Sequence, residues 1–556
     1  MHRLDSRSRE RDCCQHGLQE MNRGDAVPQE QMRLIRALQA PELYDHPVDD
    51  IWLIETHISW VILTGKLVYK IKKAVNFGFL DFSSLEKRRF YCQEEVRLNR
   101  RFAPDIYLDV VAVKGSVEHP SFHGDGRAVE YAVRMRQFSQ QALLSSMASR
   151  HGVTADHIDE IAGLVVAMHA RAAVAGANTH YGQPREIHHW VMENFKHIRP
   201  VLRNQERREQ LEDLEQWCQR EFRNKESLIQ SRKTDGFVRE CHGDLHLGNL
   251  ALIDGRITPF DCIEFNSHLR WIDVMSESAF LVMDLQDRGY RELAYHFLNT
   301  LLQQTGDYAG VGILRYYLVY RALVRAKVAA LRLSQAEMSV ETEDAAWDEY
   351  ESYVQLAASY AGSVAPGMII THGVSGSGKS WVASRLAASL GAVQVRSDVE
   401  RKRLFGYRMD AKTGSGMQSD IYTAQADVQT YVRLAGLAQF LIEGGYTAIV
   451  DATFLRRNDR DRFRQLAGRL GVPFVLLDFS AEQDTLRQRI RARQGSGHDP
   501  SEAGVEVLDV QLRSQETLDP DECPHTIMIE TSREPTLSDL ARRIARKIRP
   551  VGDDQD

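Results

Sequence analysis

The sequence predicts two domains, an α+β domain followed by an α/β domain built on a parallel sheet. Its 556 residues are enough for about two to four domains of ordinary size. The first half begins with alternating apolar and polar residues and ends in helical patterns. After about residue 367 the pattern becomes a repeated strand, loop and helix, which is typical of parallel sheets with crossover helices. A single small module is therefore excluded.

The composition is that of an ordinary globular protein. Lys and Arg number 70 and Asp and Glu number 77, for a net charge of −7, with 43% hydrophobic and 26% charged residues. This balance excludes a nucleic-acid coat protein and a protein dominated by an acidic tail. The seven cysteines are too irregularly spaced for a disulfide framework or a CxxC zinc site, which favours a reducing, cytoplasmic compartment.

No part of the sequence is expected to cross a membrane. No uninterrupted apolar run approaches the roughly 20 residues that span a bilayer. Residues 1–25 are rich in arginine but lack the apolar core of a secretory signal, and Met21 is an alternative start. We expect this leader to be disordered.

The first domain is predicted to span residues 26–360. Its alternating segments indicate antiparallel strands, and its later segments have the period of buried helices. The domain therefore starts rich in strands and ends helical. The expected elements are a helix at 29–40, strands within 51–65 and 66–73, a helix at 83–102, a strand at 128–138, a helix at 158–174, several helices within 274–333 and a helix at 343–362.

The second domain is predicted to span residues 367–550. The segment SVAPG marks the boundary, and we place the linker at 361–366. Helices are expected between the strands, which makes the sheet parallel. The expected strands are 368–373, 392–398, 446–454 and 473–480.

A phosphate-binding loop follows the first strand of the second domain. Residues 373–380, GVSGSGKS, match the pattern GxxxxGK[ST] between a strand and a helix, the context that this pattern needs. The backbone amides of such a loop curl around phosphate oxygens, and the helix N-terminus adds partial positive charge. Lys379 is then expected to reach the β and γ phosphates of ATP, and Ser380 to bind Mg²⁺. The nucleotide-binding residues expected here are Gly373, Val374, Ser375, Gly376, Ser377, Gly378, Lys379 and Ser380.

Three charged residues stand where later strands end. Asp398 is placed to accept a proton from an acceptor hydroxyl, and Arg401, one helical turn on, to hold an anionic group of that acceptor. Asp451 ends another strand at the same carboxyl edge, where open α/β sheets bind ligands, and we assign it as a metal ligand. A helix N-cap is the alternative role of Asp398.

A row of arginines precedes a glycine-rich loop near the end of this domain. Arginines in such a place are suited to close over the transferring phosphate as a lid. Arg489 and Arg493 lie four residues apart on one helical face, so we favour them as nucleotide-binding residues over Arg487 and Arg491. A solvated helix face is the alternative.

These motifs resemble those of the P-loop kinases grouped with phage polynucleotide 5′-kinase, zeta-toxin-like kinases and gluconate kinases. The resemblance rests on DxxR at Asp398 and Arg401, on the VDAT strand and on RxxxR at Arg489 and Arg493. It implies an ATP-binding domain in which Asp398 is the general base and the two lid arginines contact the nucleotide.

A second phosphoryl-transfer motif lies in the first domain. The stretch HGDLHLGN at 242–249 is followed by a short hairpin and Asp261. Kinase-like folds use an Asp to orient the acceptor hydroxyl, and an Asn and a second Asp to hold Mg²⁺. We therefore expect Asp244 to be catalytic and Asn249 and Asp261 to bind the metal.

The two histidines of this motif have an alternative role. His242 and His246 are four residues apart, as zinc ligands on a helix are, but no third ligand with zinc spacing follows. We expect His242 to brace the loop by hydrogen bonding.

The stretch closely resembles the Brenner motif of aminoglycoside phosphotransferases and of choline or homoserine kinases. The resemblance covers roughly residues 30–335 and implies a protein-kinase-like fold. It also implies a strand lysine for the α and β phosphates and a helix glutamate that holds this lysine. Lys70 and Lys72 share one face of a strand, Glu94 and Glu95 lie on the next helix, and we favour Lys70 with Glu95.

The first domain also departs from that family. No GxGxxG loop precedes the two lysines, and ETHISWVILTG stands in its place. The metal-binding segment reads FDCIEFN, in which Glu264 adds a carboxylate. An active transferase and an ATP-binding pseudokinase both stay open.

The order of the domains resembles that of bacterial proteins described as bifunctional aminoglycoside phosphotransferase and ATP-binding proteins. We expect an ATP- and Mg²⁺-dependent phosphotransferase whose second domain phosphorylates a hydroxyl-bearing small molecule. The first domain is then a second transferase or a regulatory ATP site. The alternatives are an ATP-binding signalling module with little transfer activity and a kinase that acts on nucleic-acid 5′ ends. The sequence does not predict the oligomeric state.

Overall fold

The structure of this chain is a computed structural model that describes residues 27–78, 80–333, 339–363, 365–413, 420–496 and 501–548. The leader at residues 1–25 lies outside these residues. The chain divides into two compact units, unit 1 with Met1–Gly152 and Glu240–Ile272, and unit 2 with Val153–Arg239 and Asp273–Asp556. The linker predicted at 361–366 falls inside unit 2, and its role as a domain boundary stays a prediction.

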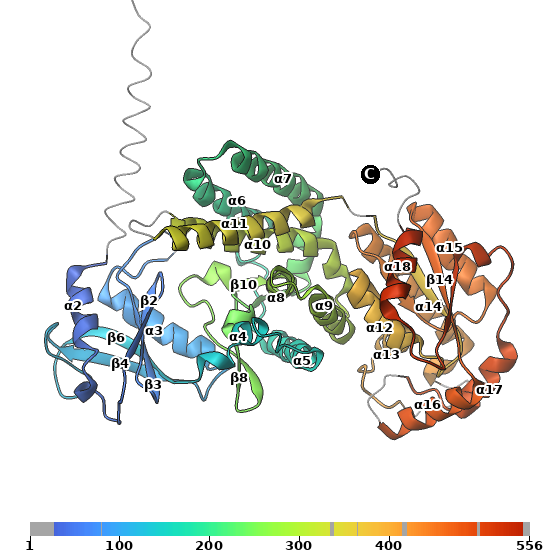
Figure 1. The fold of residues 1–556 in the computed structure, drawn as a ribbon, viewed down its shortest axis with the longest axis horizontal. Helices are drawn as coiled ribbons and strands as arrows, with labels where there is room; N and C mark the ends of the chain where they lie inside the picture. The colour runs from blue at the N-terminus through green and yellow to red at the C-terminus, as the bar shows by residue number, and fades with distance from the viewer. Residues whose placement is uncertain are drawn as a thin grey trace, which may run out of the picture. The chain divides into compact units, whose positions relative to one another are not determined.

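Unit 1 is built on a six-stranded antiparallel sheet with the order β1-β2-β3-β6-β4-β5, drawn in blue to cyan in Figure 1. Apolar side chains on alternate positions of β2 and β3, such as Ile62 and Ile71, form a core with Leu34 of α2 and with Leu38, which directly follows the helix. The predicted helices and strands of this region are confirmed, whereas β4 was not predicted. The elements are α2 (Gln29–Ala37), β1 (Trp52–Glu55), β2 (Ser59–Leu63), β3 (Leu67–Lys72), α3 (Leu85–Asn99), β4 (Tyr107–Gly115), β5 (Pro120–Ser121), β6 (Ala128–Arg136), α4 (Leu144–Ala148), β8 (Leu250–Ile253) and β9 (Arg256–Pro259).

A tight hairpin between β8 and β9 brings the ends of the second phosphoryl-transfer motif together. The strands are joined by Asp254 and Gly255, which both have positive φ, as in a two-residue type I′ turn. In this register Phe260 donates its backbone N–H to the Asn249 carbonyl at 3.0 Å. Asn249 therefore lies next to the segment that carries Asp261.

The first part of unit 2 is helical. The helices predicted within 158–174, 274–333 and 343–362 are confirmed, and α8 is buried along almost its whole length. No prediction covers α6 and α7, and the sequence of α7 is mostly charged. The elements are α5 (Ala155–Arg171), α6 (Pro184–Ile198), α7 (Gln205–Thr234), α8 (Val274–Asp287), α9 (Arg291–Thr305), α10 (Val311–Leu333) and α11 (Val340–Ala361). The short strands β7 (Val238–Glu240) and β10 (Trp271–Asp273) each include residues of both units.

The C-terminal part of unit 2, drawn in orange to red in Figure 1, contains a five-stranded sheet. Its strand order is β12-β13-β11-β14-β15, and every pair is parallel. Apolar residues of α12 and α18, including Leu386 and Ile544, cover one face of the sheet. Because β11 is central, the chain builds outward on both sides of it, and ligands bind at the carboxyl edge of such a switch point. The elements are β11 (Met368–His372), α12 (Lys379–Leu390), β12 (Val393–Arg396), α13 (Ser397–Leu404), α14 (Ala424–Glu443), β13 (Ala448–Asp451), α15 (Arg457–Leu470), β14 (Phe474–Ser480), α16 (Gln483–Ser496), α17 (Val505–Ser514), β15 (Thr526–Glu530) and α18 (Leu537–Ile548).

Helix α9 covers the open edge of this sheet within unit 2. The Asn299 amide donates to the Ala392 carbonyl at 3.0 Å, and its oxygen accepts from the Gln394 N–H at 2.7 Å. These bonds satisfy backbone groups that an edge strand leaves exposed. Strand β12 is therefore anchored by a helix that lies outside the α/β part. For this reason, experiments on the C-terminal part of unit 2 need the full chain.

The predicted fold class is confirmed. An α+β part with an antiparallel sheet precedes an α/β part with a parallel sheet and a phosphate loop. Among the described helices, none combines the length and the apolar character that crossing a membrane requires.

Candidate functional site

The phosphate loop connects β11 to α12 in a shape that its glycines permit. Gly373, Gly376 and Gly378 all have positive φ, which residues with side chains disfavour. A Cβ on Gly373 would lie 2.6 Å from the Phe479 carbonyl oxygen, and one on Gly376 would lie 2.9 Å from that of Leu486. The loop therefore packs closely against neighbouring backbone and needs glycine at these positions.

Lys379 is buried at the first position of α12. Its Nζ donates to the Val374 carbonyl at 2.8 Å, so the side chain lies along the loop. Burial lowers the pKa of Lys379 to about 8, and the charges of Asp451 and Asp398 oppose this change. A buried ammonium group needs anionic partners, and a bound phosphate is such a partner.

Asp451, at the end of β13, lies beside the loop. Its buried carboxylate accepts hydrogen bonds from the Ser380 hydroxyl and from Gln394 Nε2, the latter at 3.0 Å. Burial raises the pKa of Asp451, whereas Arg396, Ser380 and Lys379 oppose the rise. A hydroxyl and a carboxylate are oxygen donors of the kind that Mg²⁺ prefers, so these residues fit a magnesium ion.

Asp398 lies at the same edge, in the first turn of α13. The helix begins at Ser397 with Arg396 as its N-cap, so the N-cap interpretation of Asp398 is wrong. The half-buried carboxylate is near enough to affect the charges of Lys379 and Asp451. The ends of three neighbouring strands, β11, β12 and β13, thus bring together the Lys379 ammonium group, the Ser380–Asp451 pair and the Asp398 carboxylate.

The Arg401 side chain is engaged with α14 and with the segment that precedes it. Its Nη1 donates to the Ile421 carbonyl at 2.9 Å, and its Nη2 donates to Asp427 Oδ1 at 2.7 Å. The guanidinium also lies 5.4 Å from the centre of the Tyr422 ring, a residue that sequence reasoning missed. Arg401 therefore shapes the side of the site next to Asp398 while its charge is paired.

Arg489 lies against the phosphate loop. Its guanidinium donates to Thr531 Oγ1 at 3.1 Å, to the Thr531 carbonyl at 2.6 Å and to the Gly376 carbonyl at 3.4 Å. Arg493, one turn on, lies near enough to affect the charge of Lys379 and donates to the Ala503 carbonyl at 2.8 Å.

The other two arginines of the row point elsewhere. Arg487 pairs with Asp509 of α17 at 3.2 Å, and Arg491 is exposed. The structure therefore brings Arg489 and Arg493, rather than Arg487 and Arg491, to the phosphate loop. Residues 497–500 of the glycine-rich segment lie outside the described residues.

Two further residues that contact the loop were missed by sequence reasoning. Gln511 of α17 accepts a hydrogen bond from the Ser375 N–H at 2.8 Å, and Thr531 donates to the Ser377 carbonyl at 2.9 Å. Thr531 follows the last parallel strand directly, so the rule that ligands bind at the carboxyl edge would have found it. No sequence signal marks Gln511.

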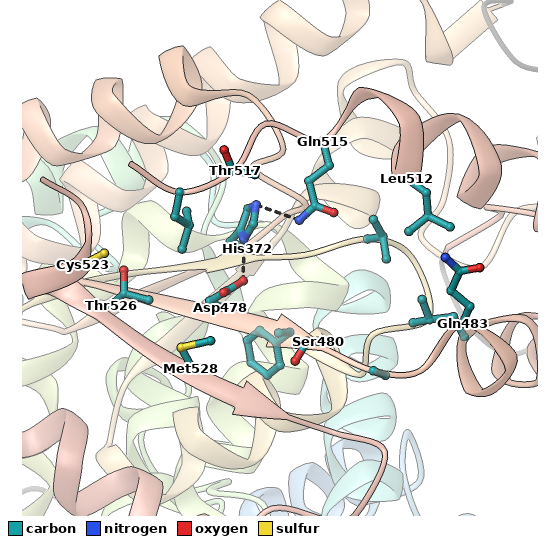
Figure 2. Close-up of a pocket in the computed structure, with 15 residues that line it drawn as sticks. His372, Asp478, Ser480, Gln483, Leu512, Gln515, Thr517, Cys523, Thr526 and Met528 are labelled. Carbon is teal, nitrogen blue, oxygen red and sulfur yellow. Dashed lines mark hydrogen bonds and ion pairs between the residues drawn. The ribbon is translucent and has the colours of Figure 1, made fainter. Parts of the chain in front are cut away.

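A cavity of about 650 Å³ adjoins the phosphate loop and is lined by parts of β14, β15 and α17 (Figure 2). A hydrogen-bonded chain lies in its wall, in which His372 Nδ1 lies 2.7 Å from Asp478 Oδ1 and His372 Nε2 lies 3.2 Å from Gln515 Nε2. His372 is the last residue of β11, directly before the loop. This chain links the end of α17 to the strand that carries the loop.

In unit 1 the predicted lysine and glutamate meet the predicted metal ligand. Lys70 Nζ lies 2.8 Å from Glu95 Oε1 and 2.5 Å from Asp261 Oδ1. Burial acts to lower the pKa of Lys70, but Asp261 and Glu95 outweigh it and raise that pKa well above its usual value. Burial likewise acts to raise the pKa of Glu95, but the lysines lower it to about 2. Glu94 pairs instead with Arg97 at 2.8 Å.

The loop at 242–249 is braced from within. His242 Nε2 donates to the Phe260 carbonyl at 2.9 Å, which confirms the predicted bracing. Asn249 Nδ2 donates to Asp244 Oδ2 at 3.0 Å. The Asp and Asn of the motif therefore lie side by side, and the hairpin places Asn249 next to the segment that carries Asp261.

Comparisons with known proteins match both parts of the chain. A family model described as an AAA domain matches residues 368–518. Uncharacterized proteins of Mycobacterium tuberculosis and Mycobacterium bovis are each 29% identical over 457 residues, which is 82% of this chain and 89% of theirs. The AAA match includes the phosphate loop, Asp398 and Asp451, and it supports nucleotide binding at that loop.

Two solved structures illustrate the structural similarity. A putative kinase from Chloroflexus aurantiacus is 20% identical and covers 33% of this chain and 100% of its own, with a TM-score of 0.27. A choline/ethanolamine kinase family protein from Mesorhizobium loti is 11% identical and covers 59% of this chain and 98% of its own, with a TM-score of 0.35. The strand order and pairing given above define the fold independently of these scores.

Proposed function

We propose that the C-terminal part of unit 2 is a kinase that transfers a phosphoryl group from ATP to a hydroxyl acceptor in the presence of Mg²⁺. One observation carries this proposal, the meeting of Lys379, the Ser380–Asp451 pair and Asp398 at one sheet edge. Phosphoryl transfer needs charge stabilisation, metal ligands and a proton acceptor in fixed positions, and little covalent chemistry from the protein. These residues match those needs.

The residues around this centre have proposed roles of their own. Arg489 and Arg493 are the lid arginines that stabilise the transferring phosphate. Asp398 accepts the proton of the acceptor hydroxyl. Arg401 contacts an anionic acceptor by exchanging its partner Asp427 for the acceptor's charge.

The experiment that tests this function is transfer of the labelled γ-phosphate of ATP to sugars, nucleosides, oligonucleotide 5′ ends and aminoglycosides by the full chain. We expect transfer to a hydroxyl-bearing small molecule. Transfer to oligonucleotide ends alone would make the protein a nucleic-acid end kinase. Slow hydrolysis with no acceptor used would make it an ATP-dependent signalling module and contradict the proposal.

Nucleotide binding at the phosphate loop is expected to weaken as the pH rises above about 8. The phosphates pair with protonated Lys379, and burial lowers the pKa of this lysine to about 8. Below that pH the ammonium group is already charged, so it contributes little pH dependence to nucleotide binding. Above it, affinity falls by up to about tenfold per pH unit. The measurement is calorimetric titration with Mg·ATP between pH 7 and 9.5. Lys379→Arg is the matched control, because its guanidinium stays charged; parallel profiles for the two chains would contradict the prediction.

We infer a second Mg·ATP site in unit 1. Lys70, Glu95 and Asp261 form its charged end. The strand register places Ile54 opposite Val61, and Val61 opposite Lys70, so the apolar side chains of β1 and β2 share the face that carries this lysine. Ile54 is nevertheless 38% exposed. An exposed apolar surface beside a phosphate lysine suits a nucleotide base.

Removal of the Asp261 carboxylate is expected to weaken Mg·ATP binding to unit 1 strongly, because this side chain is the proposed metal ligand that adjoins Lys70. Calorimetric titration with a non-hydrolysable ATP analogue should give two sites for the parent chain and one for Lys379→Ala. The double variant Lys379→Ala/Asp261→Ala should show at least about a tenfold loss at the remaining site.

Asp244→Asn in the Lys379→Ala chain is the matched control. It keeps the shape and the contact with Asn249, so binding should persist while any transfer by unit 1 stops. If Lys379→Ala leaves no binding at millimolar nucleotide, the inferred site of unit 1 is wrong.

A further inference from the structure

A second buried lysine lies beside Lys70 in unit 1, and the proposed nucleotide site leaves it without a role. Lys70 and Lys72 are two residues apart on β3, so their side chains lie on the same face. Glu95 lies between them, with Oε1 2.8 Å from Lys70 Nζ and Oε2 2.7 Å from Lys72 Nζ. One carboxylate therefore holds both ammonium groups.

The second partners of the two lysines differ in burial. Lys70 pairs with Asp261, whose side chain is 43% exposed. Lys72 pairs with Glu264, and these side chains are 0% and 4% exposed. The Phe82 ring lies 4.9 Å from Lys72 Nζ. Lys70 therefore faces the open end of the site, and Lys72 is enclosed by protein.

Glu264 belongs to the same short loop as Asp261, and that loop is held in an unusual conformation. Asp261 has a φ of +62°, which residues other than glycine seldom adopt, so surrounding contacts must maintain it. The N–H groups of residues 261–263 donate to Tyr107 Oη at 3.0 Å, to Asn99 Oδ1 at 2.9 Å and to the His242 carbonyl at 3.1 Å. The pair of Glu264 with Lys72 is a further anchor at the end of the loop.

We propose that Lys72 is a positioning residue, which ties α3 to the metal-binding loop through Glu95 and Glu264 so that Asp261 faces the metal and Lys70 alone serves the phosphates. This proposal rests on the Mg·ATP site inferred in unit 1. With a metal ion bound, Asp261 would hold the metal and Lys70 would pair with phosphate, while Lys72 would keep its contact with Glu95. The two lysines thus have separate tasks although they share one carboxylate.

The test uses the full chain with Lys379→Ala, so that the phosphate loop does not contribute. Lys72→Met is compared with Lys72→Arg and with Lys87→Met, a control at an exposed lysine of α3 that pairs with Asp81. The readouts are the Mg²⁺ concentration that half-saturates binding of the non-hydrolysable ATP analogue, and the hydrogen exchange of amides 261–263 without nucleotide.

Lys72→Met should raise the Mg²⁺ requirement about tenfold and speed the exchange of the loop amides, since residues that orient metal ligands typically act at this scale. Lys72→Arg should restore both readouts, because its guanidinium can pair with two carboxylates. Lys87→Met should match the parent chain. A folded Lys72→Met chain with the Mg²⁺ dependence and amide exchange of the parent would overturn the proposal.

Two further comparisons keep the test decisive. If Lys72→Met does not fold, Glu264→Gln must show the same rise in Mg²⁺ requirement. Lys70→Met should lower nucleotide affinity at every Mg²⁺ concentration; the same behaviour in Lys72→Met would mean that both lysines bind phosphate and would overturn the division of tasks. If the Lys379→Ala chain without further substitutions binds no nucleotide, the site inferred in unit 1 is wrong. Amide exchange still decides whether Lys72 positions the loop.

Discussion

Lys379→Ala is expected to lower phosphoryl transfer by the C-terminal site at least about a hundredfold, because catalysis there is largely electrostatic. The ammonium group is buried in the phosphate loop, with Asp451 and Asp398 close enough to act on its charge. Its removal takes away the buried cation that offsets the charges of these two carboxylates and of the bound phosphates. The measurement is transfer to the acceptor found in the screen, in a full chain that also carries Asp261→Ala to silence unit 1.

Stability and a control variant separate this effect from misfolding. Burial of an ammonium group is costly, so Lys379→Ala is expected to melt no lower than the parent chain. Lys196→Ala, at a lysine of α6 whose side chain is 73% exposed, should keep the parent's turnover. Unchanged transfer by the Lys379→Ala chain would remove the phosphate loop from the mechanism.

Asp398→Asn is expected to lower kcat by roughly 10² to 10⁴ while the KM for ATP changes little. The amide keeps the shape of the side chain but cannot take the proton of the acceptor hydroxyl. Asp398 follows β12 whereas the phosphate loop follows β11, so this substitution leaves the nucleotide contacts in place. Steady-state kinetics with ATP and the acceptor varied in turn give both constants.

Asp410→Asn is the matched control for this substitution. Asp410 lies in the segment after α13, its side chain is 65% exposed, and it pairs with Arg408. Its replacement should leave both constants unchanged. If Asp398→Asn retains full kcat, the general base must be sought elsewhere, and Asp451 is the next candidate.

The phosphate loop and the motif at 242–249 could be located from the sequence because each is a local pattern. The spacing of glycines, lysine and serine between a strand and a helix determines the loop's backbone and its chemistry together. The same holds for the short hairpin, whose Asp254–Gly255 turn determines that Asn249 lies next to the segment that carries Asp261. Elements without a clear apolar pattern were not predicted. The mostly charged helix α7 is an example, because packing against other parts of the chain, rather than its own sequence pattern, stabilises this helix.

Burial and long-range pairing were decided only by the tertiary structure. The sequence places Lys70 and Lys72 on one face of a strand and cannot distinguish them, because side chains two residues apart on a strand are equivalent. In the structure Lys70 pairs with Asp261, 191 residues further along the chain, whereas Lys72 pairs with Glu264, 192 residues further along. In the same way, the partner Asp427 that pairs the charge of Arg401 lies 26 residues further along the chain. Local sequence determines backbone shape, whereas the packing of distant segments determines which charge is enclosed and which stays open to a ligand.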